Sequence, residues 1–352
     1  MFRTTHVYPE QHVEERHDVI NIGKLVNTDT VVGIPYNSLG QHVIILGATG
    51  SGKTTTTAVL VSQISRLEDI RVLVIDWHGE YRRLIKCRYI NPYRGLRLIF
   101  NNVLADAMDV FEEVLELTPP QSYIMYKTLR EIYGGKRENS VDVEEILTSI
   151  QSRLEESIEE SSGLREAKYA LVRKLSLFER ESARDLFSGE DSLDEILYTA
   201  DNPVVLDVSL IREPSVRKAY TLVLLKQLLR KRGLENKYRV LVVLEEAHNL
   251  MPRGRQSFLS RYVAEVRKYG IVLVIVTQSP SSIIEDAMKN TGTKIIHSIR
   301  SAVDLEMVSK LIKLPLEYEK LLPVLEPGEA IFYNPVYKKP LLIRVDKNLI
   351  KN

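Results

Sequence analysis

The chain has 352 residues, 44% hydrophobic and 27% charged, a balance that is typical of a globular protein and excludes a disordered chain. Its 48 basic and 47 acidic residues argue against a protein that coats nucleic acid by bulk charge, although a local basic surface stays open. The single cysteine, Cys87, excludes an intramolecular disulfide and a multi-cysteine zinc site and fits a reducing cytosol. No apolar stretch reaches membrane-spanning length and the N-terminus has no signal-peptide core, so we expect a cytoplasmic protein without membrane insertion.

The stretch Ile20–Pro35 predicts two short strands joined at Asn27–Asp29. This hairpin leads directly into the next predicted strand, so we expect it to pack on the domain that follows. We assign residues 1–36 to an N-terminal segment with short strands.

Residues 43–67 predict a buried strand, a glycine-rich loop and an amphipathic helix, in that order. The loop, Gly47–Thr54, fits G-x-x-x-x-G-K-[ST] without a mismatch, which is the pattern of a phosphate-binding P-loop. The glycines let backbone N–H groups approach the phosphates, Lys53 would reach the β- and γ-phosphates, and the Thr54 hydroxyl would bind Mg²⁺. The predicted residues for ATP are Gly47, Ala48, Thr49, Gly50, Ser51, Gly52, Lys53, Thr54 and Thr55.

A second buried strand is predicted at Arg71–Asp76, and polar residues follow it directly. Parallel strands of a nucleotide-binding sheet present functional residues at their carboxyl ends. We therefore expect Asp76, His78 and Glu80 at the rim of the active site. The alternative is a polar turn closed by Gly79.

Residues 103–199 lack strand-like runs and show helical periodicity instead. Pro119–Pro120 and Gly134–Gly135 punctuate the segment, and Glu155–Gly163 is acidic. We expect an all-helical insertion over 103–199 whose charged residues form a solvated face. The nucleotide-binding core would then consist of residues 37–102 and 200–352.

Beyond residue 200, strand-like runs again alternate with helical ones. Each predicted strand is nearly continuous in Val, Ile and Leu, which favours an α/β fold with a mostly parallel sheet covered on both faces. The last two runs, 330–333 and 341–345, are predicted to be edge strands. The other strands are predicted at 203–209, 239–244, 271–276 and 294–299, and the helices at 220–229, 256–268, 283–289 and 304–314.

Adjacent carboxylates, Glu245 and Glu246, end the apolar run Leu241–Leu244. The first would lie near Mg²⁺, through its waters, and the second would polarise the attacking water. The alternative is a solvated acidic helix start, because Asp and Glu favour helix N-termini. At the end of another strand, the neutral amide of Gln278 suits a γ-phosphate sensor, because it can hydrogen-bond both the phosphate and the water.

These residues, taken together, resemble the HerA group of the HerA–FtsK ATPases. The similar motifs are Gly47–Thr54, Asp76–Tyr81, Leu244–Pro252, Val266–Gly270 and Thr277–Pro280, and their order and spacing agree over most of the chain. The resemblance implies a RecA-like ATPase core that assembles into hexameric rings and moves double-stranded DNA through a central channel.

The resemblance also implies roles for particular residues. Glu246 would be the catalytic glutamate, Gln278 the sensor and Arg267 an arginine finger that reaches the neighbouring subunit. For Arg267 the alternatives are an ion pair within its own chain, for example with Glu265, or a solvated side chain; Arg300 is the second candidate for the finger.

The chain departs from the family pattern in three places. Glu245 stands where the family usually has Asp, and its longer arm should still serve an outer-sphere metal role. Trp77 stands in place of Pro. The residues before the P-loop are too few for the family's β-barrel domain, so we expect a short form whose ring assembly and partnership with the family's nuclease are open.

The leading functional hypothesis is therefore an ATP-driven ring motor that translocates double-stranded DNA. Alternatives are a secretion- or conjugation-type ATPase that acts on protein or a nucleoprotein complex, a viral or plasmid packaging motor, and a nucleotide-dependent scaffold with slow hydrolysis. Near-zero net charge favours the protein-directed and scaffold alternatives. Arg253, Arg255 and Arg261 are candidates for contacts in the channel, and a solvated helix face is the other explanation for them.

Overall fold

The computed structural model describes residues 11, 16, 18–134, 140–157, 161–179, 183–187, 189–231, 238–253, 259, 263, 266–283 and 285–350. The chain divides into two compact units. The first unit consists of Met1–Val72, Tyr81–Lys86 and Tyr238–Asn352, and the second of Leu73–Glu80 and Cys87–Lys237. Among the residues described, no helix is both long enough and apolar enough to cross a membrane.

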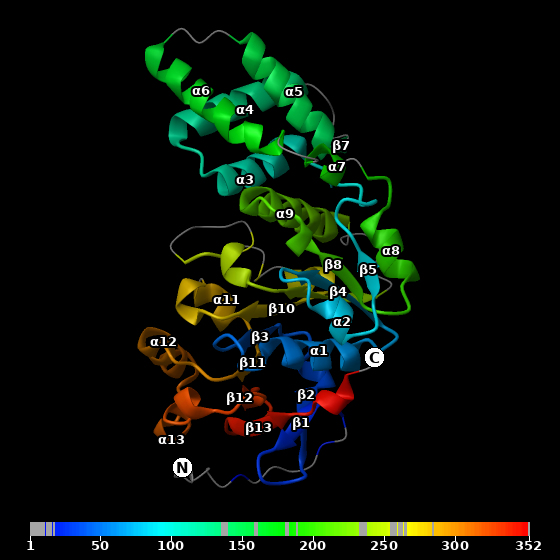
Figure 1. The fold of residues 1–352 in the computed structure, drawn as a ribbon, viewed down its shortest axis with the longest axis vertical. Helices are drawn as coiled ribbons and strands as arrows, with labels where there is room; N and C mark the ends of the chain where they lie inside the picture. Colours follow the sequence, from blue (N-terminus) through cyan, green and yellow to red (C-terminus); the bar gives the residue numbers. More distant parts are fainter. Residues whose placement is uncertain are drawn as a thin grey trace. The chain divides into compact units, whose positions relative to one another are not determined.

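A parallel sheet forms the centre of the first unit (Figure 1). Its strands lie in the order β11 (Thr293–Ile296), β3 (Val43–Leu46), β10 (Ile271–Thr277) and β9 (Arg239–Leu244). Apart from Arg239, every residue of these strands is buried, as expected for parallel strands that are covered on both faces. The predicted α/β fold with a mostly parallel sheet is confirmed, although β11 ends three residues before the predicted strand does.

An antiparallel extension continues this sheet in the order β2-β1-β13-β12 and joins it at β11. Its strands are β2 (Val31–Pro35), β1 (Val19–Leu25), β13 (Leu341–Val345) and β12 (Glu329–Tyr333). The predicted N-terminal hairpin is present as β1 and β2. The prediction that 330–333 and 341–345 are edge strands is wrong, because β1 pairs with β13 and leaves β2 at the edge.

Short helices surround the sheet of the first unit, and α1 (Lys53–Ile64) packs against β1 and β3. We predicted an amphipathic helix here, but every residue from Thr56 to Ser62 is buried, because η8 (Lys347–Leu349) also contacts α1. Of the helix predicted over 256–268, most lies outside the described residues, and Val266–Tyr269 forms η5. The remaining helices are η1 (Tyr36–Ser38), α2 (Tyr81–Leu84), η4 (Ala247–Asn249), η6 (Pro280–Ser282), α11 (Glu285–Lys289), α12 (Ala302–Ile312), α13 (Leu316–Glu319) and η7 (Leu322–Val324).

The second unit contains parallel strands and a layer of helices. Strand β4 (Ile70–Asp76) enters it at Leu73, where β8 (Val204–Asp207) pairs with it and β5 (Arg88–Ile90) pairs with β8. The helices are α3 (Val103–Leu115), α4 (Pro119–Tyr133), α5 (Val143–Glu156), α6 (Ser162–Leu175), η2 (Ser176–Phe178), α7 (Ala183–Phe187), α8 (Leu193–Thr199), η3 (Val208–Leu210) and α9 (Pro214–Lys231).

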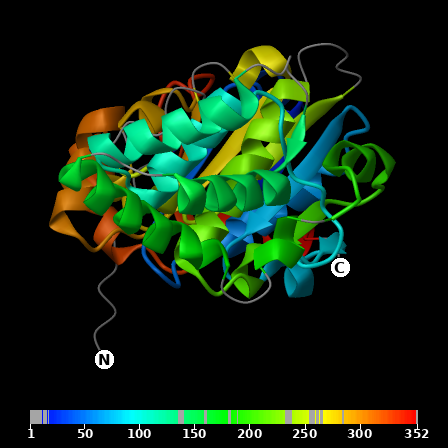
Figure 2. The ribbon, with the colours of Figure 1, turned by 90° about the horizontal axis from the view of Figure 1, so that it is seen from above.

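Helices α3 to α6 pack against one another, and they lie side by side in Figures 1 and 2. A run of buried rings, from Phe100 through Phe111, Phe178 and Phe187 to Tyr220, connects this layer to α9, with successive ring centroids 5.9–6.4 Å apart. One short strand, β7 (Val141–Asp142), pairs with β6 (Ile99–Phe100), so residues 103–199 are not helical throughout.

Candidate active site

The P-loop follows β3 and ends where α1 begins at Lys53. Gly47, Gly50 and Gly52 all have positive φ, at 151°, 75° and 112°, a region that other residues rarely adopt. A Cβ atom on Gly47 would lie 2.6 Å from the Cβ of His297, so this position has no room for a side chain. The Lys53 ammonium donates a hydrogen bond to the Ala48 carbonyl oxygen at 3.0 Å, across the loop. The loop therefore has the backbone geometry of a phosphate cradle.

The carboxyl ends of the parallel strands meet beside this loop. Leu46 of β3 is in register with Thr277 of β10, and Ile275 of β10 is in register with Leu244 of β9. The residues after β9 and β10, which include Glu246 and Gln278, consequently lie at the edge of the sheet that carries the P-loop.

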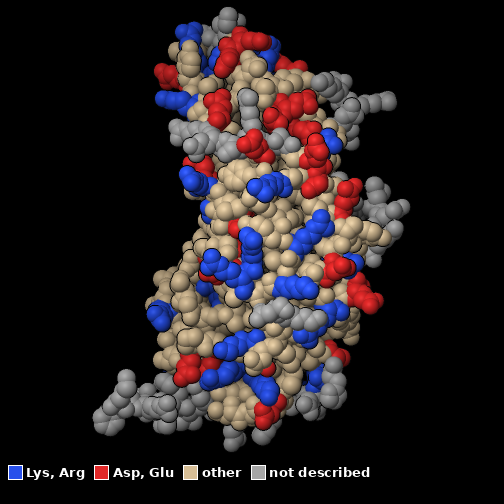
Figure 3. All heavy atoms as spheres, turned by 45° about the vertical axis from the view of Figure 1, so that its right-hand side comes forward, with Lys and Arg blue, Asp and Glu red and all other residues tan. Residues whose placement is uncertain are grey.

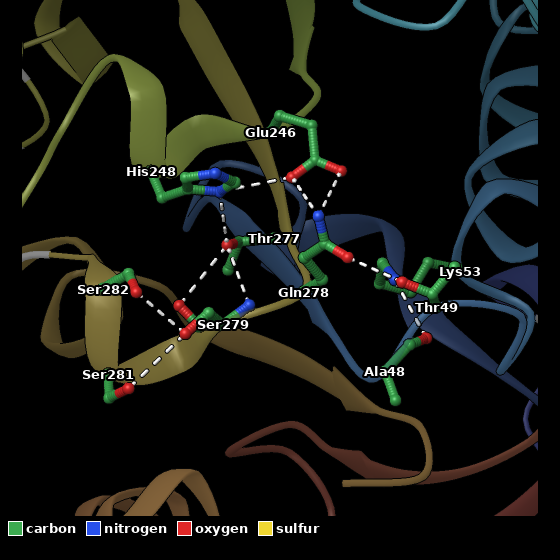
Figure 4. A network of polar contacts seen from close by, with 10 residues as sticks. All are labelled: Ala48, Thr49, Lys53, Glu246, His248, Thr277, Gln278, Ser279, Ser281 and Ser282. Atoms are coloured by element: carbon green, nitrogen blue, oxygen red, sulfur yellow. Dashed lines mark hydrogen bonds and ion pairs between the residues drawn. The ribbon is translucent and has the colours of Figure 1, made fainter. Parts of the chain in front are cut away.

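A chain of hydrogen bonds connects the P-loop to Glu246 through Gln278 (Figure 4). The Thr49 hydroxyl donates to the Gln278 amide oxygen at 2.7 Å. The amide nitrogen of Gln278 donates to the two carboxylate oxygens of Glu246 at 3.2 and 3.3 Å. Gln278 thus contacts the phosphate loop with one end of its amide and the candidate base with the other.

His248 also lies beside Glu246. Its Nδ1 atom lies 3.2 Å from a Glu246 carboxylate oxygen and 3.3 Å from the Thr277 hydroxyl, and an N–H at Nδ1 would donate to both (Figure 4). Glu246 itself has φ 46°, a left-handed conformation that costs energy in a non-glycine residue and occurs often at functional sites. The sequence showed His248 only as part of a motif, and we predicted no role for it.

The adjacent carboxylates have different environments. The Glu245 side chain is buried, with 3% of its surface exposed, and accepts a hydrogen bond of 2.7 Å from the Tyr81 hydroxyl. Glu246 is bonded to Gln278 and His248 instead. Glu245 and Glu246 therefore have different hydrogen-bond partners although they are adjacent in sequence. The sequence does not show this difference, because it depends on where the fold places Tyr81.

His297, which follows β11, packs against the P-loop and the first turn of α1. It is fully buried, and its ring nitrogens lie 2.8 Å from the Thr56 hydroxyl and 2.8 Å from the Glu329 carbonyl oxygen. Burial lowers the pKa of His297 to about 4, so the ring is neutral at pH 7. A neutral ring that donates from Nδ1 to Glu329 accepts the hydroxyl proton of Thr56 at Nε2. Gly328, which directly precedes β12, also contacts the P-loop, because its backbone N–H donates to the Ser51 carbonyl oxygen at 3.0 Å.

Arg267 lies at the opposite, amino end of these strands. It precedes β10, and its Nε atom is 3.9 Å from the Cβ position of Gly40, a short distance before β3. The structure therefore does not bring Arg267 to the P-loop of its own chain. Arg300, which follows β11 at the carboxyl end, is exposed.

In the second unit, the residues predicted at the rim form a local turn. The Asp76 carboxylate accepts hydrogen bonds from the backbone N–H groups of His78, at 3.2 Å, and Gly79, at 2.8 Å. Gly79 has φ 74°, as a tight turn of this kind requires. Glu80 comes directly before α2.

The fold and the loop together define a RecA-like core of the P-loop NTPase class. A solved structure of VirB4 from Thermoanaerobacter pseudethanolicus has the same fold, with a TM-score of 0.70 and 20% identity over 94% of this chain and 97% of VirB4. The bacterial coupling protein TrwB, solved with ADP and Mg²⁺, gives a TM-score of 0.63 and 13% identity over 95% of this chain and 90% of TrwB.

The sequence comparisons are more specific than the fold. The model of the central domain of the helicase HerA matches residues 20–228. The DNA double-strand break repair helicase HerA of Sulfurisphaera tokodaii is 30% identical over 93% of this chain and 69% of that helicase. The chain belongs to the HerA family, as its motifs predicted.

Proposed function

We propose that this protein is an ATP-hydrolysing ring motor that translocates double-stranded DNA, with six copies in the ring. The observation that carries the proposal is the hydrogen-bonded chain Thr49–Gln278–Glu246, which connects the phosphate cradle to a carboxylate. Such a connection suits an enzyme that hydrolyses nucleotide better than one that only binds it. Relatives named as DNA repair helicases support DNA as the substrate.

In this proposal the P-loop amides and Lys53 hold the phosphates of ATP. Glu246 takes the proton of the attacking water, and Gln278 orients that water against the γ-phosphate. His248, whose Nδ1 atom lies 3.2 Å from a carboxylate oxygen of Glu246, holds this carboxylate in direction.

The residues also fit a Mg²⁺ ion. Thr54 follows Lys53 in the first turn of α1, and Glu245 is a buried carboxylate with one oxygen bonded to Tyr81, so the site offers hard oxygen donors in a polar setting. We propose that Thr54 and Glu245 hold this ion, Glu245 through water. When bound, Mg²⁺ neutralises charge on the transferred phosphoryl group.

We propose that Arg267 acts on the nucleotide of a neighbouring copy. Within one chain Arg267 and the P-loop are at opposite ends of the parallel strands, so a catalytic role for this cation requires a second copy. In other nucleotide hydrolases a cation supplied in this way accelerates hydrolysis by about 10³- to 10⁵-fold.

DNA contact in this protein would use local basic residues. The face that Figure 3 draws carries Lys and Arg as well as Asp and Glu, and neither sign covers the whole of it, in keeping with the net charge of +1. Among the sequence candidates, Arg253 is exposed and its guanidinium lies 3.8 Å from Glu285, whereas Arg255 and Arg261 lie outside the described residues.

The test is ATPase activity of the purified chain with and without duplex DNA. We expect DNA to stimulate turnover, the stimulation to fall steeply between about 50 and 200 mM salt, and Glu246→Gln to stall turnover while ATP binding remains. Basal activity that depends on Lys53 and ignores DNA would contradict the DNA motor and favour an ATPase that works on protein.

A further inference from the structure

A cavity of about 450 Å³ lies at the amino ends of β3, β10 and β11, at the opposite end of these strands from the P-loop. Residues from separate segments of the first unit line it, among them Arg267, Lys289, Asn290, Thr291, Lys294 and Tyr333. Basic side chains from three elements thus converge on one hollow, and the described residues that line it include no Asp or Glu.

Lys294 is the distinctive residue of this cavity. Only 6% of its surface is exposed, its ammonium donates to the Thr291 carbonyl oxygen, and it lies 5.6 Å from the centroid of the Tyr333 ring. Within the described parts of the chain, no carboxylate forms an ion pair with Lys294 or Arg267. A buried ammonium without a counter-ion is costly, and burial lowers the pKa of Lys294 to about 8. An anion in the cavity would remove this cost.

The neighbouring histidine adds no charge to the cavity. His42 accepts a hydrogen bond at Nδ1 from the Leu273 N–H at 3.0 Å, so its proton is on Nε2, which contacts the Val263 carbonyl oxygen at 2.9 Å. Burial lowers the pKa of His42, which keeps the ring neutral at pH 7. The charge of the cavity therefore comes from Lys294, Arg267 and Lys289, of which Lys289 is shared with Glu285 at 3.1 Å.

We propose that this cavity is a second phosphate-binding site, which takes a terminal phosphate group on Lys294 at its floor and Arg267 at its mouth. Two cations match the charge of a phosphate, and the exposed side-chain amide of Asn290 lies beside them as a further donor. A terminal phosphate can enter the cavity and reach the buried ammonium of Lys294. A backbone phosphate of duplex DNA cannot, because the double helix is too wide to enter the cavity. If copies assemble as proposed above, the phosphate would be that of a neighbour's nucleotide, and only this statement of its source rests on the proposed function.

The experiment measures binding of inorganic pyrophosphate to the full chain by calorimetry, in a Lys53→Ala background that weakens the P-loop. We expect Lys294→Met to lower the affinity at least tenfold and Arg267→Gln to lower it as well. The control is Lys310→Gln, which removes an exposed lysine that pairs with Glu306 and should leave the affinity unchanged. Residual binding at the P-loop would not respond to Lys294, so the comparison between variants isolates the cavity.

Two results of this experiment would contradict the phosphate-binding site. Equal affinities in the Lys294→Met and Lys310→Gln chains, or no binding of pyrophosphate, would overturn the proposal. Because Arg267 is exposed, its variant keeps the test valid even if Lys294→Met fails to fold. Duplex DNA without terminal phosphates should not displace pyrophosphate, and displacement that requires Lys294 would overturn the assignment to a terminal phosphate. The experiment does not use ATPase activity, so a negative result for the phosphate site is distinct from a negative result for the proposed motor function.

Discussion

Replacing Lys294 by methionine should change how the stability of the protein depends on pH. Burial lowers the pKa of this lysine from 10.5 to about 8, a difference that corresponds to about 3 kcal/mol at 1.36 kcal/mol per pKa unit. The unfolded chain binds the proton between these two pH values and the folded chain does not, so wild-type stability should rise as pH increases from 8 towards 10.5. Below pH 8 the full cost of the buried charge is present.

Lys294→Met keeps an unbranched chain of similar length and removes the charge. It loses the hydrogen bond to Thr291 and the contact with the Tyr333 ring, together about 1–3 kcal/mol. Both contacts favour the ammonium, so their dependence on pH is already included in the folded-state pKa of about 8. The stability of the variant relative to wild type should therefore decrease by about 3 kcal/mol between pH 8 and pH 10.5.

Urea unfolding followed by circular dichroism at a series of pH values measures this difference. Lys310→Gln serves as the control, because an exposed lysine should give a difference from wild type that hardly varies with pH. A constant difference between Lys294→Met and wild type would refute the reasoning, since it would mean that the folded chain does not disfavour the charged ammonium. In addition, phosphate buffer should stabilise wild type more than the variant at pH 7 if the cavity binds phosphate.

Three further outcomes are expected. Gln278→Met removes the hydrogen bonds of Gln278 to the P-loop and to Glu246, and it should lower the ATP turnover number by about 10²-fold or more with little loss of ATP affinity. An equal loss of turnover number and ATP affinity would mean that Gln278 serves only binding. Arg267→Ala and Lys53→Ala chains should each be inactive but regain ATPase activity when mixed, and no recovery in assemblies shown to have exchanged copies would contradict a role for Arg267 in trans. Burial of His297 should destabilise wild type by about 3 kcal/mol as pH falls from 6.5 to about 4, because the unfolded ring gains a proton there and the folded one does not; thermal unfolding of His297→Gln should show correspondingly less acid sensitivity.

The sequence alone determined the features that local pattern controls. The P-loop is readable because its glycines and Lys53 must occur at fixed spacing, and the parallel strands are readable because burial on both faces demands continuous apolar runs. The same patterns placed Glu246 and Gln278 at strand ends, and the family membership followed from these motifs. Turn chemistry likewise predicted the N-terminal hairpin.

Other features depend on contacts between distant segments, and only the tertiary structure decided them. The pairing of β1 with β13 turned two expected edge strands into interior ones, and η8 buried the outer face of α1. Tyr81 separates the environments of Glu245 and Glu246, although the two are neighbours in sequence. Lys294 looked like the start of an ordinary strand until the fold enclosed its ammonium beside Arg267. Local patterns show which residues are apolar and which can form turns. Hydrogen bonds and ion pairs between separate segments depend instead on which strands lie next to one another in the sheet.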